Sequence, residues 1–329
     1  MATTTTTQVA AAVTEFYDKT MLVRALPFIA HDKWGQRRPL PTGNSKTIKF
    51  RKYNALTPIT VPLSEGVAPA STALSITDIT ASIQQYGAYV EITDMVSLVN
   101  VEPVLTEAAE VLGEQSGQSL DQIYRDVLVA GTTVQYANAV ANRASVVDNV
   151  ATADLDKIIR TMQNNNARMH SSIIKAGTGI GTVPVRPAYF AICHPDVLYT
   201  LDGLTGWFSV EKYASQGPVL EGEVGAYKNI RFISSTFAKI YTGAGSATTT
   251  GKKYTGSNCD VYITLVFAKD AYGITELRKN GLKNIVKALG SAGTADPLDQ
   301  KSTSGWKATT TCKILNDAFM LRLESTAAA

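Results

Sequence analysis

Hydrophobic residues recur at helical spacing between Pro103 and Gly131. Their positions, mostly three or four apart, place them along one side of an α-helix. Pro103 suits the first turn and Gly131 suits a stop. At about 1.5 Å per residue the predicted helix is roughly 40 Å long, and Gly113 and Gly117 inside it allow a bend or a close approach. The apolar positions are Val104, Leu105, Ala108, Leu112, Leu120, Ile123, Tyr124, Val127 and Leu128.

A period of two residues before this helix predicts extended chain. In residues 45–53, Ile48 and Phe50 alternate with polar side chains, and residues 83–92 form a second extended run. The connector between them, residues 54–82, contains three prolines and many serines and threonines. We predict that the two runs pair as a long hairpin. We also expect residues 54–82 to serve assembly rather than folding, because they offer little continuous apolar surface.

After the helix, short strands and helices alternate. A second helix is predicted at residues 154–169, with Thr152 as its cap and Asp154 and Asp156 favouring its N-terminus. A short helix opens at Pro195. The pattern lacks an internal repeat and a regular strand–helix–strand alternation, which indicates an α+β fold. Strands are predicted at residues 188–193, 230–233, 261–267, 283–289, 306–314 and 319–323.

The first 44 residues are predicted to form an arm. A threonine run, Thr3–Thr7, is followed by a short amphipathic stretch at 13–26 and by a segment punctuated with prolines. Such a segment cannot form one long helix and has too little apolar surface to pack alone. Residues 1–8 also lack the basic start and apolar core of a secretory signal.

The composition is that of a globular protein large enough for two lobes or a discontinuous domain. Of 329 residues, 45% are hydrophobic and 18% are charged, and the formal net charge is +3. A dedicated nucleic-acid binder normally carries a larger basic excess. The longest apolar run, residues 261–268, is strand-sized and far shorter than the ~20 residues of a membrane span.

Candidate chemistry is sparse. The three cysteines, Cys193, Cys259 and Cys312, match neither a zinc motif nor a redox pair, and they suit small buried side chains in a reducing cytoplasm. The three histidines, His31, His170 and His194, belong to no metalloprotease motif. We therefore predict no catalytic, cofactor-binding or metal site.

Two alternatives remain open. The first is a cytoplasmic α+β enzyme that uses Cys193 and His194 as a nucleophile pair. Neighbouring residues in a strand point to opposite sides, so we favour a strand end followed by a helix start. The second is a nucleic-acid-binding protein, which would use the densest basic group. That group is Lys46, Lys49, Arg51 and Lys52.

Weaker patterns have ordinary structural interpretations. The glycine-rich run Gly177–Gly181 lacks the Gly-Lys-Ser/Thr of a phosphate-binding loop and predicts a surface loop. The carboxylate pairs Asp154/Asp156 and Glu221/Glu223 are expected to be solvated. Trp207 and Phe208 are expected to anchor a core or an interface.

Several short segments of the sequence form a recognisable set. Four lie near the C-terminus, Asp296–Lys301, Gly305–Lys307, Lys313–Asp317 and Met320–Glu324, and two are internal, Glu221–Gly225 with the strand at 230–233, and Phe267–Gly273. The C-terminal set resembles the closing signature of a tailed-phage major capsid family, in the branch named after phage N-four. The internal segments match as well, and the order of arm, extended loop, long helix and mixed α/β region fits the family.

The resemblance implies the Hong Kong 97 capsid fold. Within it, residues 1–44 would be the N-arm, 45–95 the E-loop, 96–150 the P-domain with its spine helix, 151–275 the A-domain, and 276–329 the return to the P-domain and the C-terminus. The implied function is self-assembly, through pentamers and hexamers, into an icosahedral shell that encloses double-stranded DNA.

The same resemblance implies the partners and the location. The partners would be further copies of the chain, portal and scaffolding or decoration proteins, and packaged DNA contacted non-specifically, with no membrane. The protein would be assembled in the bacterial host cytoplasm and reside in the virion capsid, without enzymatic activity or cofactors.

Overall fold

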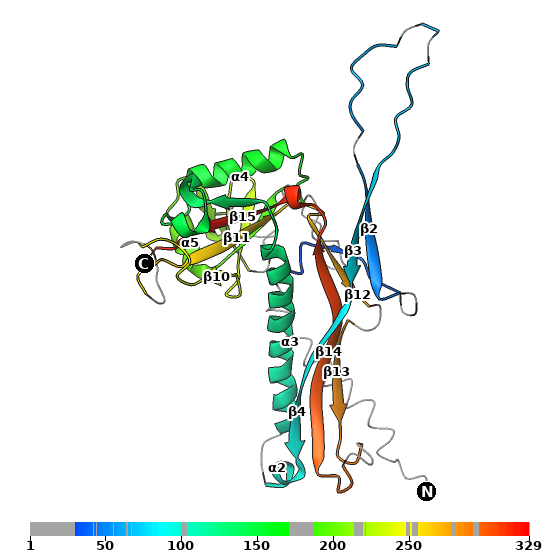
Figure 1. The fold of residues 1–329 in the computed structure, drawn as a ribbon. Helices are drawn as coiled ribbons and strands as arrows, with labels where there is room; N and C mark the ends of the chain where they lie inside the picture. The colour runs from blue at the N-terminus through cyan, green and yellow to red at the C-terminus, as the bar shows by residue number, and fades with distance from the viewer. Residues whose placement is uncertain are drawn as a thin grey trace.

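The computed structural model describes residues 30–328, except 42, 44, 55, 64, 67, 100–103, 171–186, 214–219, 221, 248–250, 252–255, 278–280 and 292–295. An elongated body carries a rounded α/β lobe at its upper end, and a long hairpin projects beyond it (Figure 1). Most of the predicted arm lies outside the described residues, as do the amphipathic stretch at 13–26, the glycine-rich run at 177–181 and Glu221.

The body is built on one long strand, β14 (Lys301–Ile314). On one edge, β4 (Gln84–Thr93) pairs with it antiparallel. On the other edge, β13 (Leu282–Lys287) and β12 (Tyr272–Glu276) pair with successive parts of it, also antiparallel. β1 (Gln36–Arg37) adds to β12 in parallel, so the N-terminal segment closes this edge of the sheet.

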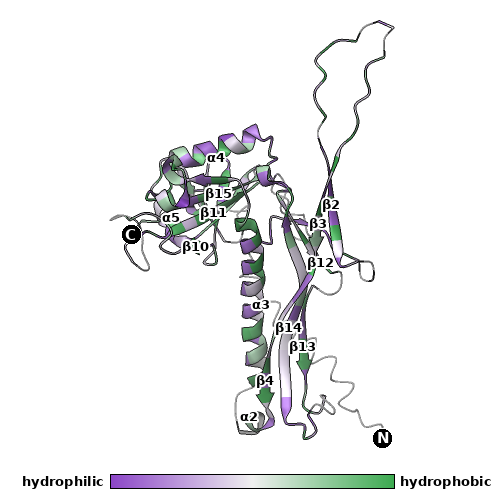
Figure 2. Ribbon diagram, in the orientation of Figure 1, coloured by the Kyte–Doolittle hydropathy of each residue, from purple (hydrophilic) through white to green (hydrophobic). Residues whose placement is uncertain are grey.

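Helix α3 (Val104–Val129) covers one face of the body sheet, which confirms the predicted long helix. Two hydrogen bonds tie it to β14: the Trp306 indole donates to Gln115 Oε1 at 3.1 Å, and the hydroxyls of Tyr124 and Thr310 are 2.7 Å apart. A shared apolar cluster continues from this contact into the lobe. In Figure 2, α3 alternates between hydrophobic and hydrophilic colouring, as a helix with one buried side does.

The lobe contains an eight-stranded mixed sheet in the order β5-β15-β11-β6-β9-β8-β7, with β10 also on β11. Helices α4 (Thr152–Asn164) and α5 (Pro195–Asp202) pack on it. The central strands β6 and β11 are buried along their whole length, as their continuous apolar sequences predict. The strands are β5 (Val134–Tyr136), β6 (Tyr189–Cys193), β7 (Trp207–Ser209), β8 (Glu223–Tyr227), β9 (Ile230–Ser234), β10 (Ile240–Tyr241), β11 (Val261–Phe267) and β15 (Met320–Ser325).

The projecting hairpin consists of β2 (Thr47–Tyr53) and β3 (Ile76–Ser82), paired antiparallel. The predicted pairing of residues 45–53 with 83–92 is therefore wrong, because residues 84–93 form β4 and belong to the body sheet. The true partner lies within the predicted connector: Ile79 stands opposite Phe50 in a second apolar alternation. Matching apolar positions on one face fixes this register.

Two details of α4 also differ from prediction. The N-cap is Ala151, not Thr152, and the Asp154 carboxylate accepts a hydrogen bond from the Ala151 backbone N–H. The helix ends at Asn164 rather than near 169, and Asn166 has a positive φ of 52° that is incompatible with continuing it. The remaining short elements are α2 (Asp94–Val99) and the 3₁₀ turns at Ala137–Ala139, Arg143–Ser145, Val210–Lys212 and Asp317–Phe319.

Candidate functional site

Cys193 and His194 do not form a nucleophile pair. Cys193 ends β6 fully buried, its thiol lies 3.7 Å from the Ile233 carbonyl oxygen, and burial raises its pKa to about 12. His194 Nδ1 instead accepts a hydrogen bond from the Asp196 backbone N–H and so caps α5. A thiolate is needed for attack, and this site disfavours one.

The carboxylate pair Asp154/Asp156 is split between two structural roles. Asp154 is buried, and it also accepts a hydrogen bond from the Asn138 backbone N–H. Asp156 lies at the lobe surface. Its Oδ1 is 2.5 Å from Lys228 Nζ and accepts a hydrogen bond from the Tyr227 hydroxyl at 2.9 Å. The Lys228 contact lowers the pKa of Asp156, whereas burial raises that of Asp154. The two groups therefore do not act on one substrate atom.

The other candidate residues are also structural or surface groups. Glu223 is buried and pairs with Arg231, Nε to Oε1, at 2.6 Å. Trp207 packs against Phe232, with ring centroids 5.2 Å apart, while Phe208 is exposed. Over the described part of the chain, no three histidine, cysteine or acidic side chains converge as a metal site would require. All three cysteines are buried, and none of them forms a disulfide.

Among the helices of the described ranges, none is both long and apolar enough to cross a membrane.

The hairpin is anchored at its base and exposed beyond it. Phe50 is buried against Gly273, where a Cβ atom would approach its ring to 2.9 Å, so glycine is needed for this close contact. The basic group lies on the same base: Arg51 pairs with Asp78, Nε to Oδ1, at 3.0 Å, and Lys52 Nζ lies 5.8 Å from the Phe319 ring centroid.

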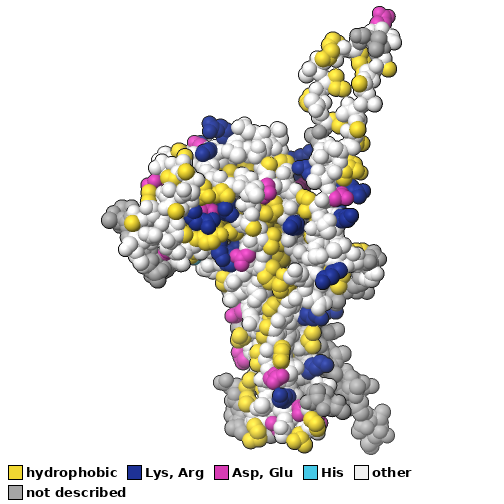
Figure 3. Space-filling model, viewed as in Figure 1, with side chains coloured by type: hydrophobic (Ala, Val, Ile, Leu, Met, Phe, Trp, Pro, Cys, Tyr) yellow, Lys and Arg dark blue, Asp and Glu magenta, His cyan; other side chains and the backbone are white. Residues whose placement is uncertain are grey.

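Beyond this base the hairpin carries exposed apolar residues. Figure 3 shows hydrophobic side chains along its length, well away from the body. Five large apolar side chains there are between 51% and 76% exposed, although burial of such groups is ordinarily favourable. An exposed apolar surface of this kind is typical of an interaction site. The five are Leu56, Ile59, Val61, Leu63 and Leu74.

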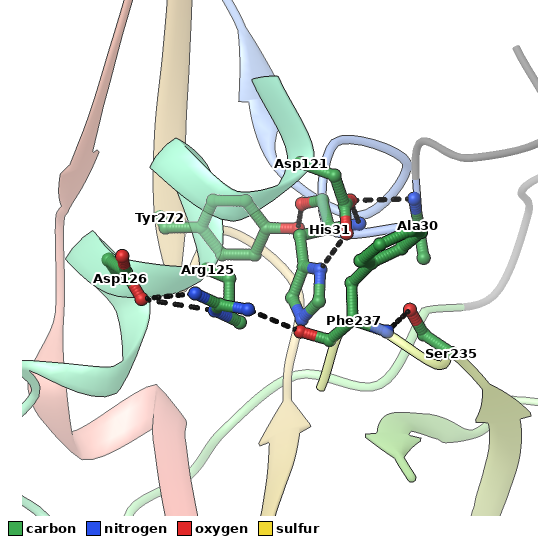
Figure 4. A network of polar contacts seen from close by, with 8 residues as sticks. All are labelled: Ala30, His31, Asp121, Arg125, Asp126, Ser235, Phe237 and Tyr272. Carbon is green, nitrogen blue, oxygen red and sulfur yellow. Dashed lines mark hydrogen bonds and ion pairs between the residues drawn. The ribbon is translucent and has the colours of Figure 1, made fainter. Parts of the chain in front are cut away.

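A buried polar junction fixes the described N-terminal segment to α3. Asp121 Oδ1 accepts hydrogen bonds from the backbone N–H groups of Ala30 and His31, both at 2.8 Å, and Oδ2 lies 2.9 Å from His31 Nδ1. The Tyr272 hydroxyl donates to the His31 carbonyl oxygen at 2.5 Å. Figure 4 shows these groups converging from α3, β12 and the N-terminal segment. Three distant parts of the chain are thereby held together.

The same helix is tied to the lobe one turn further on. Arg125 donates through Nη1 to the Phe237 carbonyl oxygen at 2.7 Å, and its Nη2 lies 2.8 Å from Asp126 Oδ1 (Figure 4). Helix α3 is thus the element that connects the N-terminal segment, the body sheet and the lobe.

Comparison with known proteins identifies this arrangement. A family model described as phage capsid protein matches residues 76–261, more than half of the chain. The chain belongs to the phage capsid protein family. This capsid protein is also 27% identical over 217 residues to the major capsid protein of Pseudomonas phage KPP21. That match covers 60% of this chain and 53% of its relative, so the capsid protein spans about half the length of the curated relative it matches.

Solved structures show the same fold. The capsid protein superposes on the capsid structure of cyanophage P-SCSP1u with a TM-score of 0.61 at 18% identity, covering 90% of this chain and 88% of that chain. For the capsid of Ralstonia phage GP4 the TM-score is 0.65 at 13% identity, covering 92% and 90%. The predicted α+β capsid fold of the Hong Kong 97 type is therefore confirmed.

The sequence did not predict two buried contacts between distant parts of the chain. The buried contact of His31 with Asp121 joins residues 90 positions apart, and the Phe50 contact with Gly273 joins still more distant ones. In the sequence His31 is only one of three isolated histidines. The one available signal was Gly273, a glycine at the start of a strand pattern, which often marks a close approach of another group.

Proposed function

We propose that this chain is a major capsid protein that self-assembles, through pentamers and hexamers, into an icosahedral shell around double-stranded DNA. The observation that carries the proposal is the projecting hairpin. An isolated two-stranded hairpin is only marginally stable, and its apolar side chains lie outside the body of its own subunit. A neighbouring copy would supply the missing burial, as in obligate assemblies.

We propose a division of the chain along the lines expected from the sequence: N-arm 1–44, E-loop 45–95, P-domain 96–150 and 276–329, and A-domain 151–275. The hairpin β2–β3 would form the projecting part of the E-loop. β4 would join that loop to the P-domain, since it pairs with β14. Helix α3 would be the spine helix.

The finer assignments are part of the same proposal. We place the protein in the branch named after phage N-four, on the strength of the C-terminal run from Asp296 to Glu324. Its further partners would be portal and scaffolding or decoration proteins, together with packaged DNA contacted non-specifically. Assembly would take place in the host cytoplasm. We propose no catalytic activity, because the most reactive-looking group, Cys193, is buried with a raised pKa.

The test is direct. Purified protein should sediment as particles of megadalton mass under assembly conditions, and negative-stain images should show closed shells of uniform size. A subunit with native-like circular dichroism that remains monomeric over a wide range of protein, salt and pH conditions would contradict the proposal.

A further inference from the structure

A basic groove lies between the base of the hairpin and the lobe. Its volume is about 800 Å³, and residues from six separate segments line it: 36–38, 50–54, 79, 165–168, 269–270 and 315–319. Five cationic side chains surround it, while Asp270 is the one carboxylate among the described lining residues, and Asp78 pairs with Arg51 at its edge. The cations are Arg38, Arg51, Lys52, Arg168 and Lys269.

The floor of this groove is apolar. Phe50, Ile79, Leu315 and Phe319 contribute to it, beside the amides of four asparagines. A cationic rim around an apolar floor fits a partner of the opposite design, an apolar side chain flanked by carboxylates. Nucleic acid matches the rim but would leave the apolar floor without a partner, so the pattern favours protein.

The chain itself carries such a group at the other end of the body. The turn that leads into β14 has the sequence Asp296-Pro297-Leu298-Asp299, here named the acidic turn. Leu298 is 75% exposed between the two carboxylates, although it is a large apolar residue. Asp296 Oδ2 accepts a hydrogen bond from the Lys301 backbone N–H at 2.7 Å, which holds the turn in shape. This turn lies at the lower end of Figure 1, where β14 begins.

We propose that the acidic turn of one copy docks into the basic groove of a second copy, with Leu298 on the apolar floor and the two carboxylates on the cationic rim. The inference rests on the proposed shell function and names one contact within it. Groove and turn lie at opposite ends of the body sheet, so the contact joins different surfaces of the two copies. Interfaces of this head-to-tail kind generate rings or extended lattices.

Arg168 and Lys269 are the best groove residues to test. Both side chains are exposed, and their backbones are held together by the hydrogen bond from the Lys269 N–H to the Arg168 carbonyl oxygen at 2.9 Å. Reversing their charge with Arg168→Glu/Lys269→Glu should leave the fold intact and lower shell yield at least tenfold. Asp299→Lys should do the same from the other side, because it reverses a charge of the acidic turn and keeps the Asp296 hydrogen bond that holds the turn in shape.

The decisive variant combines Asp299→Lys with Arg168→Glu/Lys269→Glu, which places opposite charges across the contact again. Shell yield, measured by sedimentation, should return to within about threefold of the unmodified protein. Lys283→Glu/Lys287→Glu, which reverses two exposed lysines on the body sheet away from the groove, is the matched control and should assemble normally. Either reversal assembling at full yield, or the combined variant remaining as defective as its parents, would overturn the inference.

A second readout does not depend on shells. Copies carrying Leu298→Cys and copies carrying Asn166→Cys are mixed and oxidised; the native cysteines are buried and do not compete. The contact should give disulfide-linked heterodimers in excess of either homodimer. Heterodimers without shells would support the contact while contradicting the shell function. Shells without preferential heterodimers would overturn the contact alone.

Discussion

His31 Nδ1 lies 2.9 Å from Asp121 Oδ2, and both side chains are almost completely shielded from solvent. Asp121 also accepts two backbone N–H groups, so one carboxylate satisfies three donors in a buried site. Removing a buried acceptor of this kind costs much of the folding free energy, because its donors stay buried and unpaired. The junction therefore secures the start of the described chain to α3.

We predict that Asp121→Ala lowers the free energy of unfolding by about 3–5 kcal/mol, because it leaves His31 Nδ1 and two buried backbone N–H groups without their hydrogen-bond acceptor. Urea denaturation followed by circular dichroism would measure the change. Asp126→Ala, on a half-exposed carboxylate of the same helix, is the control and should cost less than about 1 kcal/mol. Equal costs for the two variants would mean that the buried junction contributes nothing beyond surface charge.

Asp32 makes stability depend on pH. Burial raises its pKa to about 6, against the opposing effect of Arg37, and the nearby carboxylates Glu276 and Asp121 raise it further. A raised carboxyl pKa favours the protonated form in the folded state, so this contribution is complete below about pH 4 and is lost as the pH rises through 6. Asp32→Asn should therefore raise the melting temperature at pH 7.5 relative to the unmodified protein, and much less at pH 4.5.

Only the difference in melting temperature between Asp32→Asn and the unmodified protein is informative, because the titration of His170 changes the stability with pH in the opposite direction. Burial lowers its pKa to about 4, and its contribution to stability is lost as the pH falls from 6.5 towards 4. Asp78→Asn, on the hairpin surface, is the control and should not reproduce the Asp32→Asn pattern. An identical pH profile for Asp32→Asn and the unmodified protein would rule out Asp32 as the titrating group.

Two neighbouring positions on α3, one buried and one exposed, test which face of the helix packs on the body sheet. Leu112 is 3% exposed and faces the body sheet, whereas Val111 is 61% exposed. Leu112→Ala should cost about 2–5 kcal/mol of unfolding free energy through the lost contacts and the cavity. Val111→Ala should change it by less than about 0.5 kcal/mol. If the two costs are similar, the helix does not pack by the face assigned to it.

Shortening the hairpin should separate folding from assembly. The expectation that all of residues 54–82 can be removed needs revision, because β3 (Ile76–Ser82) pairs with β2. Replacing residues 56–74 with a short Gly-Ser turn should leave a soluble subunit with native-like circular dichroism, since the apolar side chains removed are exposed. The same variant should form no shells by sedimentation. Removing 54–82 instead should also destabilise the subunit.

Two results would count against this assignment of the hairpin. Aggregation of the 56–74 variant would place these residues in the subunit core, and normal shells would show that they are dispensable for assembly.

Cys193 should be unreactive in the folded protein. It is fully buried, and burial raises its pKa to about 12, so little thiolate is present at neutral pH. Mass spectrometry after iodoacetamide treatment should show Cys193 modified only once urea unfolds the chain. Rapid alkylation of the native protein would revive the enzyme hypothesis built on Cys193 and His194.

The sequence by itself determined the elements whose side chains follow one clear period. The apolar spacing of residues 104–128 specifies α3, because a helix that buries one face must repeat every 3.6 residues. The uninterrupted apolar run of β11 likewise specifies a strand buried on both faces. The family resemblance in the C-terminal sequence added the fold to which these elements belong.

Only the tertiary structure decided which elements pair. Residues 84–93 and 76–82 are both extended and both carry alternate apolar positions, so either could partner residues 47–53 by pattern alone. The choice follows from β14, whose long edge takes β4 and leaves β3 for β2. The basic groove could not be predicted from the sequence either, because its six segments are spread from Gln36 to Phe319 and no local period relates them. Side-chain periodicity encodes how each segment buries a face, but partner choice depends on long-range packing of all segments at once.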